Sequence, residues 1–410
     1  MRLTDGIIKH SLVSGLVLAF LAIAGSNVQA ASRFDRWVKS FWPQAKAVGI
    51  TWSTYRRAFS GVTPDPKIMK LANKQPEFHR PVWSYLDSAV SEKRITDGRE
   101  KLKEWRRWLN RIENQYGVDR HIVVAIWGME SSYGQVLENK KIVRNVIRSL
   151  ATLAYKGGRR ARFGRKQLLA ALKIIQNGDV SAARMVGSWA GAMGHTQFIP
   201  TTYQHYAVDA TGDGKRDIWR SIPDALASTA NYLNKARWRP GETWGYEVRF
   251  KRGFNYGLAD RKTKRSLSAW AKLGVRRANG RNFPRPGDQA WLWLPAGSDG
   301  PAFLMLPNFR SIKRYNNANS YALAVGHLAD RLRGGSEFAG NWPRNNPTLS
   351  RSHRRELQNL LNRHGFGVGS IDGKLGPKSK AAIRAYQRRA NLTPDGYAGM
   401  ALLKRLRGGG

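Results

Sequence analysis

The sequence contains no cysteine and few acidic residues, and each absence excludes a class of structure. Without cysteine the chain has no disulfide and no cysteine to carry a lipid, so its stability comes from packing. Aspartate and glutamate number 28 against 70 lysines and arginines, which gives a formal net charge of +42. Apolar residues make up 41% of the 410, enough to bury cores in two or more folded units.

Long apolar runs are also missing, except at the N-terminus. The run 12–24 follows Arg2 and Lys9 and precedes Val28-Gln29-Ala30, a small-x-small cleavage pattern. We predict a secretory signal over residues 1–30 and an exported, soluble, periplasmic protein. A membrane anchor is the alternative, although the run is short against the roughly 20 residues that a spanning helix needs.

The excess of basic residues favours an anionic partner. Nucleic acid is the usual candidate, but the sequence has no zinc-finger spacing, basic zipper or RNA-recognition signature, and export would separate the chain from nucleic acid. We therefore predict no nucleic-acid partner, and peripheral contact with anionic envelope polymers or headgroups instead. A local run such as 159–162 indicates a solvated surface.

The pattern along the chain predicts a mainly α fold. Amphipathic segments such as 221–233 and 321–332 indicate a helical domain over 31–333, and an insert at about 242–306 contains the alternating stretch 289–294, which predicts short strands. Residues 334–349 have the composition of a linker with no apolar periodicity to bury. A small module over 350–410 follows, with helix patterns at 354–364 and 377–389.

One helix pattern carries a candidate catalytic acid. Asp119 can cap a strongly apolar helix that ends at Glu130, and Ile126 and Val123 share the face of that glutamate. Burial would raise the pKa of its carboxyl, and a carboxyl that keeps its proton at neutral pH can protonate a glycosidic oxygen. The alternative is an ordinary helix-end glutamate that reaches water or an arginine. The segment 131–134 favours the acid, because small polar groups there leave space for a ligand.

Several motifs in order resemble the lytic murein transglycosylase B family. They include Glu-Ser-Ser-Tyr-Gly at 130–134 and Gly-Ala-Met-Gly-His-Thr-Gln-Phe-Ile-Pro at 191–200, with further matches at 206–209, 230–232 and 315–322. The likeness covers roughly residues 33–332. It implies a lysozyme-like helical catalytic domain that cleaves the β-1,4 bond between MurNAc and GlcNAc without water and leaves a 1,6-anhydro-MurNAc end.

The resemblance also implies site residues. Glu130 matches the catalytic glutamate. The positions that match the glycan-binding groove are Tyr85, Ser188, Gln197, Tyr232, Tyr315, Asn316 and Tyr321. Tyrosine rings can stack on sugar faces, and serine, asparagine and glutamine can bind hydroxyl or acetamido groups. Taken singly, each tyrosine is better explained as a packed core residue, and only its match to the family favours a role in binding.

An ordinary glycosidase uses two carboxylates, whereas this sequence offers one good candidate. The resemblance suggests how one suffices: the substrate's acetamido group assists at the anomeric carbon, and Glu130 acts first as acid and then as base toward the C6 hydroxyl. No cofactor is required for that chemistry. A hydrolytic muramidase and a wall-binding protein without activity remain the alternatives. Exo or endo cleavage and the oligomeric state are not determined by the sequence.

A loop at 209–217 resembles the start of a calcium site. Oxygen-bearing residues alternate and Gly214 is sixth, but Arg220 stands at position twelve, where a calcium-sensor loop has glutamate. The related family closes a similar loop with a later acid. The candidate ligands of this structural calcium are Asp209, Thr211, Asp213, the Lys215 carbonyl and Asp224. A plain Asp/Gly turn is the alternative.

The C-terminal segment resembles the small, three-helix-type peptidoglycan-binding domain. The matching positions include Leu357, Leu360 and Leu361, then Ile371-Asp372-Gly373 and Tyr386-Gln387. The implied role is targeting to peptidoglycan glycan strands, since a weak wall-binding module raises the effective concentration of a catalytic site at the polymer. A stabilising appendage is the alternative.

Overall fold

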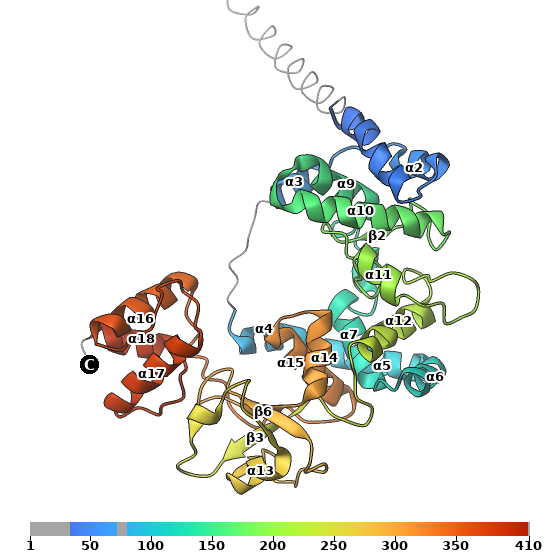
Figure 1. Cartoon of the computed structure of the whole chain (residues 1–410). Helices are drawn as coiled ribbons and strands as arrows, with labels where there is room; N and C mark the ends of the chain where they lie inside the picture. The colour runs from blue at the N-terminus through green and yellow to red at the C-terminus, as the bar shows by residue number, and fades with distance from the viewer. Residues whose placement is uncertain (1–32, 72–79, 409–410) are drawn as a thin grey trace, which may run out of the picture. The chain divides into compact units, whose positions relative to one another are not determined.

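A computed structural model describes residues 33–71 and 80–408, so the predicted signal at 1–30 lies outside the described residues. The described residues form two compact units, 33–71 with 134–225 and 80–133 with 226–408 (Figure 1). Both are mainly helical, which confirms the predicted fold class. The two units divide the predicted 31–333 domain, whose boundaries stay a prediction. Within these described ranges no helix is long and apolar enough to cross a membrane.

The first unit is built on two helices that pack side by side, α9 (Val146–Lys156) and α10 (Ala161–Gln176). Asn145 caps α9 by accepting a 2.9 Å hydrogen bond from the Arg148 N–H. Gly164 allows the close approach, since a Cβ there would lie 2.7 Å from the Ala154 nitrogen. The other elements are a helix at 33–47, α2 (Trp52–Phe59), α3 (Pro66–Leu71), α8 (Gln135–Glu138), β1 (Arg144–Asn145), η1 (Gly158–Arg160), β2 (Val186–Gly187) and α11 (Pro200–Tyr206).

In the second unit, α7 (Arg120–Ser131) packs against α15 (Asn319–Leu332) and α5 (Glu92–Glu104). The remaining helices of this layer are α4 (Val82–Ala89), α6 (Arg106–Tyr116), α12 (Ile222–Lys235) and α14 (Pro307–Tyr315). The helices predicted at 221–233 and 321–332 are confirmed as α12, whose two ends are shifted by one and two residues, and α15, which begins two residues earlier and ends as predicted.

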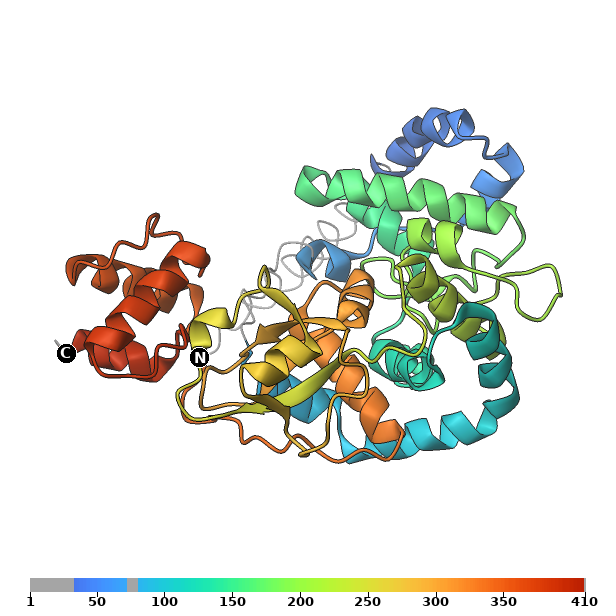
Figure 2. The ribbon, with the colours of Figure 1, turned by 60° about the horizontal axis from the view of Figure 1, so that its bottom comes forward.

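The insert folds as a five-stranded antiparallel sheet in the order β4-β6-β7-β3-β5. Its strands are β3 (Gly245–Phe250), β4 (Lys264–Ser266), β5 (Val275–Arg277), β6 (Gln289–Trp293) and β7 (Ala302–Met305), with η2 (Tyr256–Leu258) and α13 (Leu267–Lys272) between them. Leu292 pairs with Leu304, and both join Leu267 and Trp270 of α13 in one buried cluster. Figure 2 shows α13 lying against the sheet. The strand predicted from the alternation at 289–294 is confirmed as β6.

Residues 334–349 differ from a free linker because single side chains and backbone groups fasten them. The Glu247 carboxylate accepts hydrogen bonds from the N–H groups of Ala339 (2.9 Å) and Gly340 (2.8 Å). Phe338 stacks on His327 with 3.8 Å between ring centroids. The Arg344 guanidinium forms a two-pronged ion pair with Asp87 at 2.8 and 2.9 Å. Such contacts need no apolar periodicity, which explains why the composition did not indicate them.

The module consists of α16 (Arg351–Arg363), α17 (Pro377–Arg389) and α18 (Met400–Arg407). Its own core includes Leu357, Leu361, Ile383 and Leu403. The first helix begins at Arg351 rather than at the predicted residue 354, because Ser350 caps it by accepting a 3.2 Å hydrogen bond from the His353 N–H.

Candidate active site

The candidate acid lies near the end of α7. Asp119 caps this helix as predicted, accepting a 2.8 Å hydrogen bond from the His121 N–H. Val123 and Ile126, the residues predicted to share the glutamate's face, are fully buried. Glu130 is the penultimate residue of the helix, so a rigid and well-packed element holds its carboxylate.

The chain leaves α7 through a sharp left-handed turn. Ser132, Tyr133 and Gly134 have φ values of 49°, 58° and 95°, a conformation that is unfavourable for residues other than glycine. The Tyr133 ring is buried, and its hydroxyl donates a 2.8 Å hydrogen bond to the Arg94 carbonyl. A Cβ on Gly128 would lie 2.6 Å from the Tyr133 ring. The expectation that small groups at 131–134 leave space is therefore wrong at Tyr133, which packs into the unit and anchors the turn.

The Glu130 carboxyl is desolvated and hydrogen-bonded. The Tyr321 hydroxyl donates to Glu130 Oε1 at 2.6 Å. Desolvation raises the pKa of Glu130 to about 7, and the hydrogen bond from Tyr321 opposes that rise. Among the described residues no second carboxylate contributes to this shift. At neutral pH the group therefore exists in both protonation states, which suits a residue that first donates a proton and then accepts one.

Aromatic side chains surround the carboxyl. The charge of Glu130 raises the pKa values of Tyr85, Tyr315 and Tyr321, in each case after desolvation as the larger cause. The ring of Tyr232 contacts that of Tyr315 edge-on, with centroids 4.9 Å apart, and its hydroxyl donates to the Arg314 carbonyl. The structure thus brings together the predicted acid and all four predicted tyrosines.

The other three predicted substrate residues have different surroundings. Asn316 is exposed, and its side chain accepts a 3.2 Å hydrogen bond from the Ala318 N–H. Ser188 and Gln197 belong to the first unit. The Ser188 hydroxyl accepts from the Ala192 N–H at 3.0 Å, and the Gln197 amide donates to the Gly194 carbonyl at 2.9 Å. Their roles toward glycan stay predictions.

Thr229 is a site residue that the sequence reasoning missed. Its side chain is hydrogen-bonded to Tyr315, and it is almost fully buried on α12. The only signal was its spacing of three residues before Tyr232, which places both on one helix face. A threonine at such a position more often packs in a core, so the spacing alone did not identify it.

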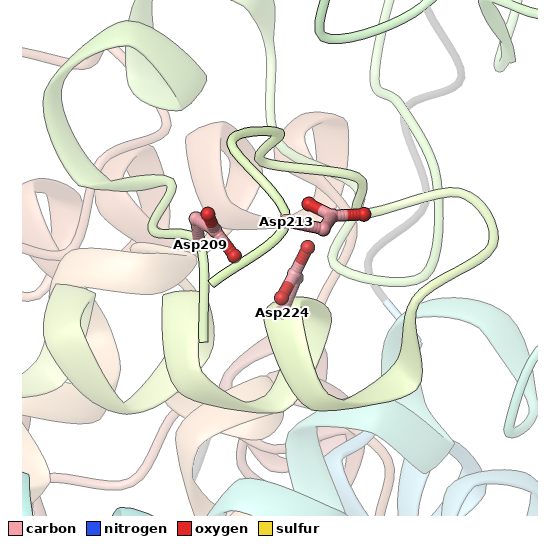
Figure 3. A group of neighbouring side chains, drawn as sticks. All are labelled: Asp209, Asp213 and Asp224. Atoms are coloured by element: carbon pink, nitrogen blue, oxygen red, sulfur yellow. The ribbon is translucent and has the colours of Figure 1, made fainter. Parts of the chain in front are cut away.

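The predicted calcium loop gathers three carboxylates. One oxygen each from Asp209, Asp213 and Asp224 lies within 4.8 Å of the others (Figure 3). Asp224 is fully buried, and desolvation raises the pKa of its carboxyl, with a smaller contribution of the same sign from the charge of Asp209. Hard oxygen ligands of this kind suit Ca²⁺, and a cation would relieve the repulsion among them.

The backbone of the loop is shaped by Asp209. Its carboxylate accepts hydrogen bonds from the N–H groups of Gly212 (2.7 Å) and Gly214 (2.8 Å), whose φ values are 79° and 82°. The Thr211 hydroxyl donates to the same carboxylate at 3.2 Å, and the Lys215 N–H donates to Asp213 at 2.9 Å. This network is also what a plain Asp/Gly turn needs, so hydrogen bonding alone does not decide between the two interpretations.

Comparison with known proteins identifies both parts of the chain. The family described as "Transglycosylase SLT domain" matches residues 33–330, and "Putative peptidoglycan binding domain" matches residues 350–406. The Membrane-bound lytic murein transglycosylase B of Escherichia coli (strain K12) is 32% identical over 261 residues, covering 63% of this chain and 70% of that protein.

Two solved structures extend the comparison. SltB3 from Pseudomonas aeruginosa, in complex with NAG-anhNAM-pentapeptide, is 52% identical with a TM-score of 0.84, over 91% of this chain and 99% of that one. The Escherichia coli lytic transglycosylase SLT35, in complex with calcium, is 27% identical with a TM-score of 0.59, over 73% of this chain and 92% of that one.

Proposed function

This chain belongs to the transglycosylase SLT domain family and is a lytic transglycosylase of peptidoglycan, and on that premise we propose that Glu130 is its single catalytic acid and base. The observation that carries the proposal is the desolvated Glu130 carboxyl, 2.6 Å from the Tyr321 hydroxyl and with a pKa raised to about 7. It supports a role in which the group changes protonation state within one turnover.

The reaction then proceeds in two proton transfers. Neutral Glu130 protonates the oxygen of the β-1,4 bond between MurNAc and GlcNAc, and the bond from that oxygen to C1 of MurNAc breaks while the acetamido group of the same sugar assists. The resulting carboxylate takes the proton of the MurNAc C6 hydroxyl, whose oxygen bonds to C1. A 1,6-anhydro-MurNAc end forms, Glu130 regains its proton and no water is consumed.

The tyrosines around Glu130 position its carboxyl group and bind the substrate. Tyr321 is a positioning residue, because its hydroxyl holds the carboxyl in place and stabilises its charged form. We assign Tyr85, Tyr232 and Tyr315, together with Asn316, Ser188 and Gln197, to substrate binding. The crystal structure of SltB3 with NAG-anhNAM-pentapeptide concerns a relative that binds an anhydro sugar, which supports this product for the present chain.

Product analysis tests the reaction type. We expect mass spectrometry of digested sacculi to show MurNAc ends that are one water lighter than reducing ends, because the C6 hydroxyl replaces water as the nucleophile. Digestion by a hydrolytic muramidase is the matched reference. Reducing ends in the products of this enzyme would contradict the proposal and establish the hydrolase alternative.

We also propose that the loop at 209–224 binds a structural Ca²⁺. The ligands would be Asp209, Thr211, Asp213, the Lys215 carbonyl and Asp224. The three carboxylates within 4.8 Å of one another, one of them buried, fit such an ion, and the relative SLT35 was crystallised in complex with calcium. The ion's contribution would be to stability, with no part in the chemistry.

The calcium proposal predicts a shift in melting temperature. At 100 times Kd, calcium should add about 2.7 kcal/mol of stability, which raises the Tm by several degrees. Differential scanning calorimetry with Ca²⁺ and with a chelator measures this shift. Asp213→Asn should abolish it, while Asp35→Asn, an exposed acid of the same unit, should keep it. A Tm that is insensitive to calcium in the unaltered protein would leave the plain turn as the correct interpretation.

The C-terminal module and the N-terminal apolar run have roles in targeting and in export. We assign residues 350–410 to targeting, since a family of peptidoglycan-binding domains matches 350–406 and the module has its own core. The apolar run at 12–24 and the small-x-small pattern support export to the periplasm, where the polymer lies. The net charge of +42 would add peripheral attraction to anionic envelope surfaces.

A further inference from the structure

A cavity of about 410 Å³ is lined jointly by the insert and by the C-terminal module. Its wall on the insert side includes Arg261 and Trp291, and its wall on the module side includes Lys380 and Arg384. A volume of this size lies in the range of small-molecule sites. Neither part of the chain builds the cavity alone.

The cavity exists because the module contacts the insert directly. The Ser298 N–H donates to Asp395 Oδ2 at 2.7 Å, and a Cβ on Gly297 would lie 2.8 Å from Tyr397. The other oxygen of Asp395 accepts from the Gln387 amide at 2.7 Å and from the Tyr397 N–H at 2.8 Å. Both oxygens of this carboxylate are thus engaged in structure and are not available to the basic residues of the cavity.

Cations face this cavity from both sides. Arg261 projects from the insert, while Arg354, Lys380 and Arg384 belong to the module, and Asp260 is the only other acid of the wall. Lys380 is exposed as a whole residue, but desolvation of its ammonium group lowers its pKa, the charge of Arg384 lowers it further and Asp260 raises it. Across the described wall the basic groups therefore outnumber the acids, and an anion between the two surfaces would offset their repulsion.

The cavity wall also contains a buried hydrogen-bond donor that lacks an acceptor among the described residues. The indole N–H of Trp291 is buried and has no hydrogen-bond partner within the described part of the chain, and Trp291 itself is 9% exposed. A buried donor without a partner costs about 1–3 kcal/mol, so a site that supplies an acceptor is favourable. Apolar wall residues such as Leu294 and Pro295 suit short aliphatic side chains beside the anion.

Helix α15 begins at the wall of this cavity. Asn319, the first residue of α15, lines the cavity, and Tyr321, two residues further on, donates to the catalytic glutamate. The MurNAc sugars of peptidoglycan carry a peptide stem, a chain with carboxylates and short aliphatic groups. These groups match the basic and apolar residues of the cavity wall.

We propose that this cavity binds a carboxylate of the peptide stem, so that the module and the insert together recognise stem-bearing glycan. The inference rests on the proposed function for its ligand. The module then takes part in recognising the substrate, in addition to attachment to the wall.

Binding of the free pentapeptide to the full chain tests the proposal without involving the glycan. In isothermal titration calorimetry, the Kd for the peptide should rise by about ten- to a hundredfold in the double variant Lys380→Met/Arg384→Gln. The reason is that the variant loses hydrogen bonds from these two side chains to a charged carboxylate. The matched control is Lys378→Met/Arg388→Gln, which removes two cations from the same helix outside the cavity wall and should bind as the unaltered chain does. A pentapeptide with its carboxylates converted to amides should bind as weakly to the unaltered chain as the acid does to the double variant.

Three results would overturn the proposal: equal affinity of the double variant and the unaltered chain, equal affinity for acid and amide peptides, or binding of inorganic phosphate without binding of the pentapeptide. The turnover assay separates this inference from the proposed function. The double variant should cleave peptide-free glycan at an unchanged rate and stem-bearing glycan more slowly. If the unaltered chain cleaves neither polymer, the proposed function fails, while the peptide-binding result still decides the cavity.

Discussion

Glu130→Gln should reduce the rate of glycan cleavage by at least about a thousandfold, because the amide can neither donate the first proton nor accept the second. The substitution keeps the size of the side chain and an oxygen that can accept the 2.6 Å hydrogen bond from Tyr321. A turbidity assay on sacculi and quantified anhydro products measure the loss. Glu100→Gln, which alters an exposed glutamate on α5 of the same unit, is the matched control and should retain full activity.

The same variant should be more stable than the unaltered protein in mild alkali, which shows that the loss of activity is not a loss of fold. In the folded chain the pKa of Glu130 is raised from 4.5 to about 7, so the folded state holds the proton more tightly than the unfolded state. Stability therefore falls as pH rises from 4.5 through 7, and above that range the ionised group costs up to roughly 3 kcal/mol that glutamine does not. Near-normal activity of Glu130→Gln would disprove the catalytic assignment.

Tyr321→Phe should lower kcat by about ten- to a hundredfold and should also shift its pH dependence. The first effect follows from losing the hydroxyl that positions the carboxyl. The second follows from the sign of the interaction: the hydrogen bond stabilises the carboxylate and lowers its pKa, so removing it raises the pKa of Glu130. The alkaline limb of the kcat profile, expected near pH 7 in the unaltered enzyme, should move to higher pH.

The pH shift distinguishes positioning from a structural role. A substitution that only loosened the fold would lower kcat without moving the limb. Tyr116→Phe is the control, because no hydrogen bond from its hydroxyl occurs within the described residues and it lies on a neighbouring helix, α6. A Tyr321→Phe enzyme with an unshifted limb would contradict the proposed coupling to Glu130.

Local patterns predicted the parts of this protein that depend on neighbours in sequence. The Asp119 cap, the apolar face of α7 and the strand at 289–293 follow from periodicity and capping, and the structure confirms them. The pairing of Glu130 with Tyr321 joins residues 191 positions apart, and only the family motifs brought both into one site. Physical reasoning on the separate segments could not have predicted that distance.

Tertiary contacts between single groups were the features that the sequence did not predict. Thr229 behind Tyr315, Tyr133 over Gly128 and the contact of Ser298 with Asp395 each depend on where two distant backbones meet. The contacts of the segment 334–349 were not predicted for the same reason, since their acceptors are carboxylates on β3 and α4.

This fastening has a consequence for the lifetime of the protein. Proteases cut segments that they can pull out and hold in an extended form, and surface stretches rich in glycine, asparagine and proline usually qualify. Here Glu247 holds two backbone N–H groups of such a stretch, Asp87 holds Arg344, and Phe338 is stacked on His327. Cleavage between residues 338 and 344 would first require these contacts to open. Contacts with neighbouring elements thus protect a segment whose composition suggests easy cleavage, and the C-terminal module stays attached to the catalytic part of the chain.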